Sequence, residues 1–339
     1  MIITQTPFRM SFFGGGTDME NFFKKYGGAV LSTTFDKYCY VNVRHLPRFF
    51  EYSTELSYSK IERITDIKDI DHPAIKNAME LLDMHEIRLT YEADLPARSG
   101  LGTSSSFAVG MLNAFYALKG KYADKKKLAD EAIYLERVLC QEAGGWQDQI
   151  AASFGGLNRI NFNTDGTYDV LPVIVSQERK KNLNNNLLMF FTGFTRFSSD
   201  VQKANASTKE TREAKEKRLR EMLSLVDDAE NVLTDKESDL DDFGRLLDHT
   251  WKLKRQTGSA VSTDSIDILY EKGIQAGALG GKLLGAGGGG FLVFYVRPEH
   301  QEAVKRAMKD LMYIPFSFED GGTRVIHYTP ETYIPLEDK

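Results

Sequence analysis

Three glycine-rich segments contain the residues best suited to chemistry on a ligand. The strongest, LPARSGLGTSSS at residues 95–106, places two glycines before a run of hydroxyl residues and an apolar run with helical spacing. The start of a helix presents unpaired N–H groups and the positive end of its dipole, and both attract phosphate oxygens. Gly100 and Gly102 lack a Cβ, so the backbone can approach a ligand closely. The segment predicts a phosphate-binding loop, although a glycine turn with an ordinary Ser or Thr cap gives the same pattern.

The hydroxyl residues that follow have three possible uses. Thr103, Ser104 and Ser105 could cap the helix, donate hydrogen bonds to phosphate, or supply a neutral oxygen to Mg²⁺. A Walker-type loop is excluded, because GALGGKL has neither the glycine spacing of G-x-x-x-x-G-K-[ST] nor a hydroxyl after Lys282. The run GAGGGG at residues 285–290 matches G-x-G-x-x-G, but it precedes the predicted strand FLVFYV instead of following one, so dinucleotide binding is disfavoured. Such a run instead lets a strand pass very near another backbone or a ligand.

The segment RMSFFGGGTD at residues 9–18 sets an arginine and an aspartate around three consecutive glycines. Backbone without side chains, between a cation and a carboxylate, suits a ligand with many hydroxyl groups, which Asp18 could bind as a hydrogen-bond acceptor. Arg9 could equally be the partner in a structural ion pair. The sequence alone leaves both roles of Arg9 open.

Two carboxylates flank the Gly-Gly break in LERVLCQEAGGWQDQIAASFGG. Glu136 lies late in a predicted helix and Asp148 just after the turn, so both can point into one cleft. Taken alone, each is more often a solvated helix residue. The six histidines lack paired ligand spacing, which argues against a His-based metal site. Cys39 and Cys140 match no nucleophile signature and are expected to be buried, reduced thiols.

Apolar periodicity places these motifs on a mixture of strands and helices. Strands are predicted over residues 2–8, 29–34, 38–46, 87–92, 157–162, 187–192, 291–296 and 324–327. Helices are predicted over residues 73–84, 107–119, 125–142, 146–153, 205–220, 239–255, 264–276 and 298–312. The helix at 205–220 is almost entirely polar and is expected to be exposed.

The chain has 339 residues, more than double the length of a typical single domain, so two domains are expected. We place the boundary between Asp169 and Leu188, which gives domains of residues 1–178 and 179–339. With 43 basic and 48 acidic side chains the net charge is −5, too acidic for binding nucleic acid or an anionic membrane through bulk electrostatics. The first residues lack the pattern of a signal peptide, and no apolar stretch is long enough to span a bilayer, so a cytoplasmic location is expected.

The three segments and the carboxylate pair together resemble the GHMP kinases, the superfamily of galactokinase, homoserine kinase, mevalonate kinase and phosphomevalonate kinase. PFRMSFFGGGTD is similar to the family's first motif, LPARSGLGTSSS to its second, ATP-binding motif, and GGKLLGAGGGGF to its third. The resemblance spans nearly the whole chain. It implies an α+β fold with a ribosomal-protein-S5-domain-2-like N-terminal domain, a ferredoxin-like C-terminal domain, and ATP and substrate in the cleft between them.

The resemblance also implies roles for single residues. Asp148 would be the catalytic carboxylate with Arg9 as its cationic partner, and Glu136 and Ser104 would be the Mg²⁺ ligands. The ATP-binding residues would be Gly100, Leu101, Gly102, Thr103, Ser104 and Ser105. Because phosphoryl transfer passes through a loose transition state, Asp148 would orient the acceptor hydroxyl first and accept its proton late.

The first motif narrows the substrate. Galactokinases carry Glu-His where this chain has Gly15 and Gly16, so recognition of galactose itself is not expected. The text FFGGGTD followed by GGAVLSTTFDKYCY is similar to bacterial D-glycero-α-D-manno-heptose 7-phosphate kinases, which form the 1,7-bisphosphate for nucleotide-heptose and surface polysaccharide synthesis. Gly15, Gly16 and Asp18 would then bind a phosphorylated sugar.

Several alternatives remain at this level. The chain could phosphorylate an unphosphorylated sugar such as L-fucose or galactose, or act as a non-catalytic sensor of sugar and ATP; a GHMP-type decarboxylase is a more distant possibility. The cations that would bind the substrate's own phosphate are not identified by type alone; those eligible are Lys37, Arg44, Arg98, Arg159 and Arg196. The segment FTGFTRFSSDVQ, with Thr192, Ser198 and Ser199, could line the cleft or simply cap a helix.

Overall fold

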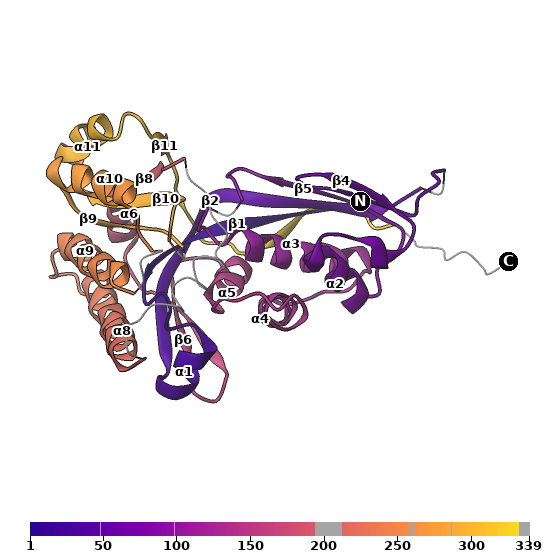
Figure 1. Ribbon diagram of the computed structural model, residues 1–339, viewed down its shortest axis with the longest axis horizontal. Helices are drawn as coiled ribbons and strands as arrows, with labels where there is room; N and C mark the ends of the chain where they lie inside the picture. Colours follow the sequence, from indigo (N-terminus) through magenta and orange to yellow (C-terminus); the bar gives the residue numbers. More distant parts are fainter. Residues whose placement is uncertain (48, 98, 194–211, 258–260, 286, 332–339) are drawn as a thin grey trace.

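The computed structural model describes residues 1–47, 49–97, 99–193, 212–257, 261–285 and 287–331. Two antiparallel-rich sheets with helices packed against them make up the molecule, one built mainly from the first half of the chain and one from the second (Figure 1). Among the described residues, no helix is both long and apolar enough to cross a bilayer.

The first sheet is organised around two long neighbouring strands, β1 (Ile2–Phe13) and β2 (Gly28–His45). We predicted two separate strands where β2 runs without interruption, and that prediction was wrong. The register explains why: Pro7 pairs with Tyr38 and Phe8 with Phe35, so the two residues between these partners are taken up by a bulge. A β-bulge accommodates extra residues and bends the strand without ending it.

The described strands of this sheet follow the order β13-β1-β2-β5-β3-β4. In addition, β12 and β6 each pair with β2, and β7 pairs with β6. The remaining strands are β3 (Thr54–Ser57), β4 (Ile61–Ile64), β5 (Ile87–Ala93), β6 (Asn158–Phe162), β7 (Tyr168–Pro172), β12 (Phe318–Glu319) and β13 (Arg324–Tyr328). The sequence predicted neither the β3–β4 hairpin nor β7. Strands β12 and β13 bring the end of the described chain back to the first sheet, against β2 and β1 respectively.

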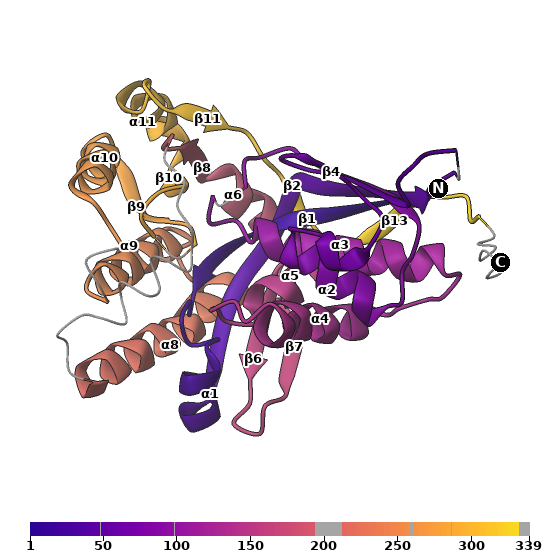
Figure 2. The same ribbon diagram turned by 45° about the vertical axis from the view of Figure 1, so that its right-hand side comes forward.

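Helices cover one face of this sheet, as Figures 1 and 2 show. They are α2 (Pro73–Leu81), α3 (Thr103–Leu118), α4 (Lys125–Ile133) and α5 (Gln147–Phe154). A short helix, α1 (Glu20–Tyr26), joins β1 to β2, and η1 (Ile67–Asp69) precedes α2. Helix α3 is buried on almost every side, with Val109, Met111 and Leu112 in the core shared with the sheet. The motif loop that precedes α3 is therefore mounted on a rigid element.

The predicted helix at 125–142 is interrupted. Helix α4 ends at Ile133, and residues Tyr134–Leu139 continue as a π-helical turn, η2, in which the Cys140 N–H bonds the Leu135 carbonyl. A π-helical turn is wider than an α-helical one and is often found at functional sites. Here the wider turn carries Glu136, whose carboxylate accepts hydrogen bonds from side chains of α3 and α5. Those bonds give a physical reason for the departure from α-helical geometry.

The second sheet has the strand order β11-β8-β10-β9 and is antiparallel. Its strands are β8 (Leu187–Phe191), β9 (Ala278–Leu283), β10 (Phe291–Val296) and β11 (Met312–Ile314). The described helices of this part are α6 (Gln177–Asn185), α8 (Arg212–Thr234), α9 (Asp241–Arg255), α10 (Asp264–Gln275) and α11 (Gln301–Ala307), with η3 (Pro298–His300) before α11. The predicted helix at 298–312 is thus a short 3₁₀ turn and α11, after which the chain becomes strand β11. Of the predicted polar helix at 205–220, residues 205–211 lie outside the described residues, and the rest opens the long helix α8.

One apolar core joins the two sheets. Phe12 and Phe13 at the end of β1 pack edge-on against Phe243 of α9, with ring centroids 5.2 and 5.1 Å apart. The same cluster includes Val226 of α8 and Met189 of β8. Buried aromatic pairs in such edge-to-face geometry contribute about 0.5–1.5 kcal/mol each beyond their buried area. The end of β1, which carries the first motif, is therefore fixed against the C-terminal helices.

Both cysteines are free thiols. Cys39 is buried in β2, and burial raises the pKa of its thiol. Cys140, which we predicted to be buried as well, is only half-buried, because it lies at the end of η2 where the helix gives way to an extended loop. The side-chain amide of Asn77 lies 3.4 Å from its sulfur.

The glycine-rich segments at residues 95–106 and 285–290 contact each other through their backbones. A Cβ built on Gly285 would lie 2.3 Å from the Gly100 Cα, and one built on Gly290 would lie 2.1 Å from the Ser99 carbonyl oxygen. Contacts this short are incompatible with any side chain, so the glycines here are required by packing as well as by their positive φ angles. The close approach attaches the C-terminal glycine run to the loop in front of α3.

We expect Gly285→Ala to lower the free energy of unfolding by about 3 kcal/mol, because the added methyl group both strains the backbone and forces the two loops apart. The matched control is Gly120→Ala. Gly120 also has a positive φ, of 67°, but a Cβ there meets nothing within 4 Å. Its replacement should cost only about 1 kcal/mol of backbone strain. Urea unfolding measures both, and equal losses would contradict a packing role for Gly285.

Candidate active site

Arg9 and Asp148 form a buried ion pair at the point where β1, the motif loop and α5 meet. The guanidinium binds the carboxylate with both ends, Nε to Oδ1 at 2.8 Å and Nη2 to Oδ2 at 2.9 Å. The third guanidinium nitrogen, Nη1, donates to the Gly100 carbonyl at 2.6 Å. Arg9 is 4% exposed, whereas the Asp148 side chain keeps 25% of its surface accessible. Because the planar guanidinium matches the carboxylate geometry, this pair fixes the direction of Asp148.

The local sequence explains how Asp148 reaches this place. The chain turns through Gly144 and Gly145 and starts α5 at Gln147, so Asp148 lies in the first turn, where the helix dipole favours a negative charge. Gly102 lies against the ion pair: a Cβ there would be 3.2 Å from the Arg9 Cγ and 3.4 Å from the Asp148 Cγ. The Asp148 carboxylate thus lies directly beside the start of α3.

Glu136 is the second carboxylate of the site and is 2% exposed. Its Oε2 accepts a hydrogen bond from the Ser105 hydroxyl at 2.6 Å and another from the Gln149 side-chain amide, and the Arg137 guanidinium lies 3.7 Å away. The serine hydroxyl that donates to Glu136 is therefore that of Ser105. Ser104, for which we predicted a role as Mg²⁺ ligand, is exposed in the first turn of α3.

The donor chemistry around Glu136 fits a hard divalent cation. Carboxylate and hydroxyl oxygens are what Mg²⁺ prefers, and it completes its octahedron largely with waters and phosphate oxygens. The side-chain oxygen of Gln149, next to Glu136, is buried and has no hydrogen-bond partner in the part of the chain that the structure describes. No group of three or more His, Cys, Asp or Glu suited to a metal occurs among those residues, and a site of this type does not require one. Glu136 with Ser104 or Ser105 would hold the ion.

Asp18 is a third carboxylate of the site, close enough to Asp148 for their charges to interact, and is 3% exposed. Its carboxylate accepts from the Gly16 N–H at 2.9 Å and the Gln147 N–H at 3.3 Å, so it ties the first motif to the start of α5. Burial, and secondarily the nearby charge of Asp148, raise the pKa of Asp18. Two carboxylates in such proximity disfavour each other's charge, and a neighbouring cation or hydroxyl donor relieves that cost.

Gly15 and Gly16 form the open part of the first motif. A Cβ on Gly15 would meet nothing within 4 Å, and one on Gly16 would approach only Leu219 of α8, at 3.1 Å. The backbone here is therefore accessible beside Asp18, between β1 and the C-terminal helix α8. Of the three residues that we predicted to bind the sugar, Gly15, Gly16 and Asp18, Asp18 lies close enough to Asp148 for the two charges to interact, and it accepts the Gly16 N–H.

Of the cations eligible to bind the substrate's phosphate, the three that the structure describes form ion pairs with other residues. Lys37 pairs with Asp36, Arg44 with Glu331, and Arg159 with Asp227 and Glu230, all through ion pairs on the surface of the protein. Arg98 and Arg196 lie outside the described residues, as do Ser198 and Ser199. Thr192 is described, and its hydroxyl donates to the Gly290 carbonyl at 3.0 Å, next to the third motif.

Two lysines that the motif analysis did not single out are close to this site. Lys282, in β9, is 2% exposed and donates from Nζ to the Phe12 carbonyl at 2.7 Å. Lys254, in the last turn of α9, donates to the carbonyl of Gly285. A signal for Lys254 was present in the sequence: it follows Leu247 and Trp251 at helical spacing, on the apolar side of α9, whereas charged residues usually occupy the opposite side.

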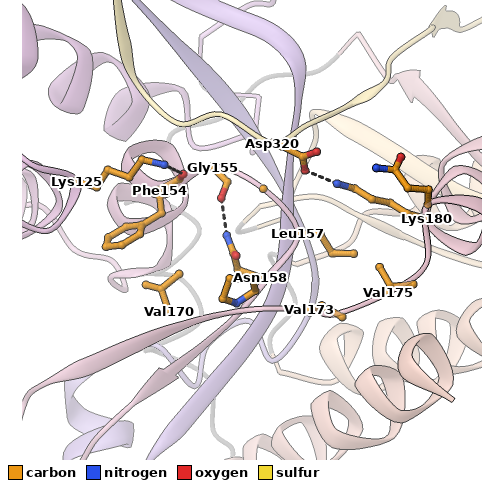
Figure 3. A pocket seen from close by; sticks show the side chains of 13 residues that line it. Lys125, Phe154, Gly155, Leu157, Asn158, Val170, Val173, Val175, Lys180 and Asp320 are labelled. Atoms are coloured by element: carbon orange, nitrogen blue, oxygen red, sulfur yellow. Dashed lines mark hydrogen bonds and ion pairs between the residues drawn. The ribbon is translucent and has the colours of Figure 1, made fainter.

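A separate cavity of about 420 Å³ lies at the far end of α5 (Figure 3). Apolar side chains line much of it, among them Leu157, Val170 and Val173, and an ion pair of Lys180 with Asp320 lies at its edge. None of the predicted site residues lines it. We therefore assign the chemistry to the residues around Asp148 and not to this cavity.

The chain matches the family model for the GHMP kinases N terminal domain over residues 71–156 and that for the GHMP kinases C terminal domain over residues 228–314. A D-glycero-alpha-D-manno-heptose 7-phosphate kinase of Campylobacter jejuni is 29% identical over 341 residues, covering 95% of this chain and 98% of the relative. An L-fucokinase/L-fucose-1-P guanylyltransferase of Bacteroides fragilis is 28% identical over 227 residues, which cover 65% of this chain and 23% of the relative.

The fold agrees with these matches. A solved structure of a D-glycero-D-manno-heptose 1-phosphate kinase from Bacteroides thetaiotaomicron has a TM-score of 0.77 at 24% identity, and the match covers 96% of this chain and 99% of that one. This chain belongs to the GHMP kinases and has their two-domain α+β fold. It is a sugar kinase, a phosphotransferase with an alcohol group as acceptor, and ATP is the phosphoryl donor that the family uses.

We expect Asp148→Asn to lower kcat by about a thousandfold while leaving the affinity for ATP within about twofold of the wild type. The amide keeps the size of the side chain but can neither accept the acceptor's proton nor pair fully with Arg9. Steady-state kinetics and calorimetric titration with a non-hydrolysable ATP analogue measure the two quantities. Near-normal turnover in this variant would remove Asp148 from the catalytic role.

Proposed function

We propose that this chain transfers the terminal phosphate of ATP to the anomeric O1 of D-glycero-α-D-manno-heptose 7-phosphate, giving the 1,7-bisphosphate. The observation that supports it most is the position of Asp148, which Arg9 holds with its carboxylate beside Gly102 at the start of α3. A relative of nearly the same length carries the name of this activity, at 29% identity over 95% of the chain.

ATP would bind with its phosphates on the loop of residues 100–105. Gly100 and Gly102 have φ angles of 82° and 72°, which turn the backbone into the start of α3. Helix α3 has 16 residues, so its first turn offers unpaired N–H groups and a full helix dipole to the phosphates. Thr103, Ser104 and Ser105 add hydroxyl groups in that turn. Mg²⁺, when bound, would neutralise charge on the ATP phosphates from the side of Glu136 and one of these serines.

Asp148 would then act on the acceptor hydroxyl. Its carboxylate accepts the hydrogen bond of the sugar's O1–H and so points an oxygen lone pair at the terminal phosphorus. As the new O–P bond forms, the bond between the terminal phosphorus and its bridging oxygen breaks and ADP leaves. The proton of O1 becomes acidic and passes to an Asp148 oxygen. Arg9 keeps the carboxylate in place throughout and stabilises its charge before the transfer. Alignment of the two reactants supplies most of the acceleration, because the transition state is loose and needs little covalent assistance.

The sugar would lie against the first motif. The open backbone at Gly15 and Gly16 leaves room for a seven-carbon sugar, and Asp18 has remaining lone pairs to accept a hydrogen bond from a ring hydroxyl. The fucokinase relative matches a smaller share of this chain than the heptose phosphate kinase does, 65% against 95%. That difference favours the phosphorylated heptose over an unphosphorylated sugar.

A substrate panel tests this choice. With ATP held constant, we expect kcat/KM for D-glycero-α-D-manno-heptose 7-phosphate to exceed that for L-fucose, galactose and the unphosphorylated heptose by about a hundredfold or more, because a site built for a phosphate loses its charge-assisted hydrogen bonds with the neutral sugar. A coupled assay of ADP release measures all four. A preference for a free sugar would reassign the substrate, and no ADP release with any sugar would favour a sensor.

Variants of Ser104 and Ser105 distinguish the proposed Mg²⁺ ligand from the serine that donates to Glu136. We expect Ser104→Ala to raise the Mg²⁺ concentration for half-maximal activity by about tenfold. Ser105→Ala should instead lower stability, because the buried Glu136 carboxylate loses a hydrogen-bond donor. Activity against free Mg²⁺ at saturating ATP, together with thermal unfolding, measures both. An unchanged Mg²⁺ requirement in Ser104→Ala with a raised one in Ser105→Ala would place the ion on Ser105.

A further inference from the structure

Lys254, half-buried in the last turn of α9, has no carboxylate partner among the residues that the structure describes. Its Nζ donates to the Gly285 carbonyl and lies 3.5 Å from that of Leu283. No carboxylate oxygen of the described residues forms a salt bridge with it, and an ammonium group has three N–H bonds to donate. The neighbouring Lys252, two residues earlier on α9, is exposed and pairs with Asp248 at 2.6 Å.

Lys254 lies near the loop that we propose to bind the phosphates of ATP. Gly285, which holds its ammonium, packs directly against Gly100, and the Gly100 carbonyl receives the Nη1 donor of Arg9. Lys254 and Arg9 thus approach the loop of residues 100–105 from different domains, one from α9 and the other from β1. Among the described residues, Asp148 pairs with Arg9, and Asp18 is a carboxylate whose charge acts on Lys254.

The surroundings of Lys254 disfavour its charged form, and a bound anion would stabilise that form. Burial, and next the positive charge of Arg9, lower the pKa of Lys254 to about 8, while Asp18 acts in the opposite direction. Burial, and next the charge of Lys254, hold the pKa of Lys282 in β9 well below its ordinary value. A site with several desolvated cations is stabilised by a multiply charged anion such as a phosphate.

We propose that Lys254 is a phosphate-binding residue of the active site, supplied by the C-terminal domain to the terminal phosphate of ATP. This rests on the proposed role of residues 100–105 in ATP binding, but not on which sugar is the acceptor. The same ammonium chemistry would suit the phosphate carried by the sugar, and its closeness to Gly100 and Arg9 favours the nucleotide. Closure of the phosphate site then requires both domains.

The test uses Lys254→Gln and, as matched control, Lys252→Gln. Glutamine removes the charge and keeps N–H donors on a side chain that is one bond shorter. Calorimetric titrations with Mg²⁺ present compare an ATP analogue with an imido bridge between the last two phosphates against ADP, and steady-state kinetics give KM for the sugar phosphate. Thermal unfolding of each variant reports whether the fold is intact.

We expect Lys254→Gln to lose about tenfold or more in affinity for the ATP analogue, with ADP affinity within about twofold of the wild type and Lys252→Gln unchanged for both ligands. A raised KM for the sugar phosphate with unchanged nucleotide affinities would retain the phosphate-binding role and move it to the acceptor. Unchanged values for all three ligands, or equal losses for the ATP analogue and ADP, would overturn the proposal. The nucleotide titrations contain no sugar, so an error in the proposed acceptor leaves them unaffected.

Discussion

The site depends on one buried ion pair, the bidentate contact between Arg9 and Asp148. It joins residues 139 positions apart in the sequence and brings three elements to one point: the end half of β1, the loop before α3 and the first turn of α5. Removing Asp148 would leave the buried Arg9 guanidinium unpaired, which is far more costly than the pair itself is stabilising. The main role of the pair is therefore to position the Asp148 carboxylate. It aims one carboxylate at the place where a helix start can hold phosphate.

The remaining architecture keeps that point fixed from two sides. Helix α3 is enclosed by the first sheet and its helices, so the phosphate loop stands on a rigid support. From the other side, Phe243 of α9 packs on Phe12 and Phe13, and Gly285 packs on Gly100. Because both contacts are short and buried, they fix the position of the C-terminal half relative to the loop before α3. This is how the backbone of a glycine run and the ammonium of Lys254 come to lie next to a loop from the first half of the chain.

Much of this arrangement could be predicted from the sequence, because glycine and hydroxyl patterns report directly on backbone geometry. The helix start after Gly102 and the turn before Asp148 follow from such local signals, and apolar runs predict strands β8 and β10, but not β9 or β11, of the second sheet. Contacts that depend on tertiary packing did not. The bulge that lets β2 continue through residues 36 and 37, and the π-helical turn that presents Glu136, are stabilised by partners far away in the chain. Which of two adjacent serines reaches Glu136 depends on the rotation of α3, and spacing alone does not determine it.

The central claim is that Asp148 orients the acceptor hydroxyl toward a terminal phosphate held by residues 100–105. A crystal structure of the enzyme with a non-hydrolysable ATP analogue, Mg²⁺ and the sugar phosphate tests this most directly. The account predicts an Asp148 carboxylate oxygen within about 3 Å of the acceptor oxygen, and the terminal phosphate on the backbone N–H groups at the start of α3. An acceptor oxygen hydrogen-bonded to a different group, or phosphates bound away from that loop, would contradict it.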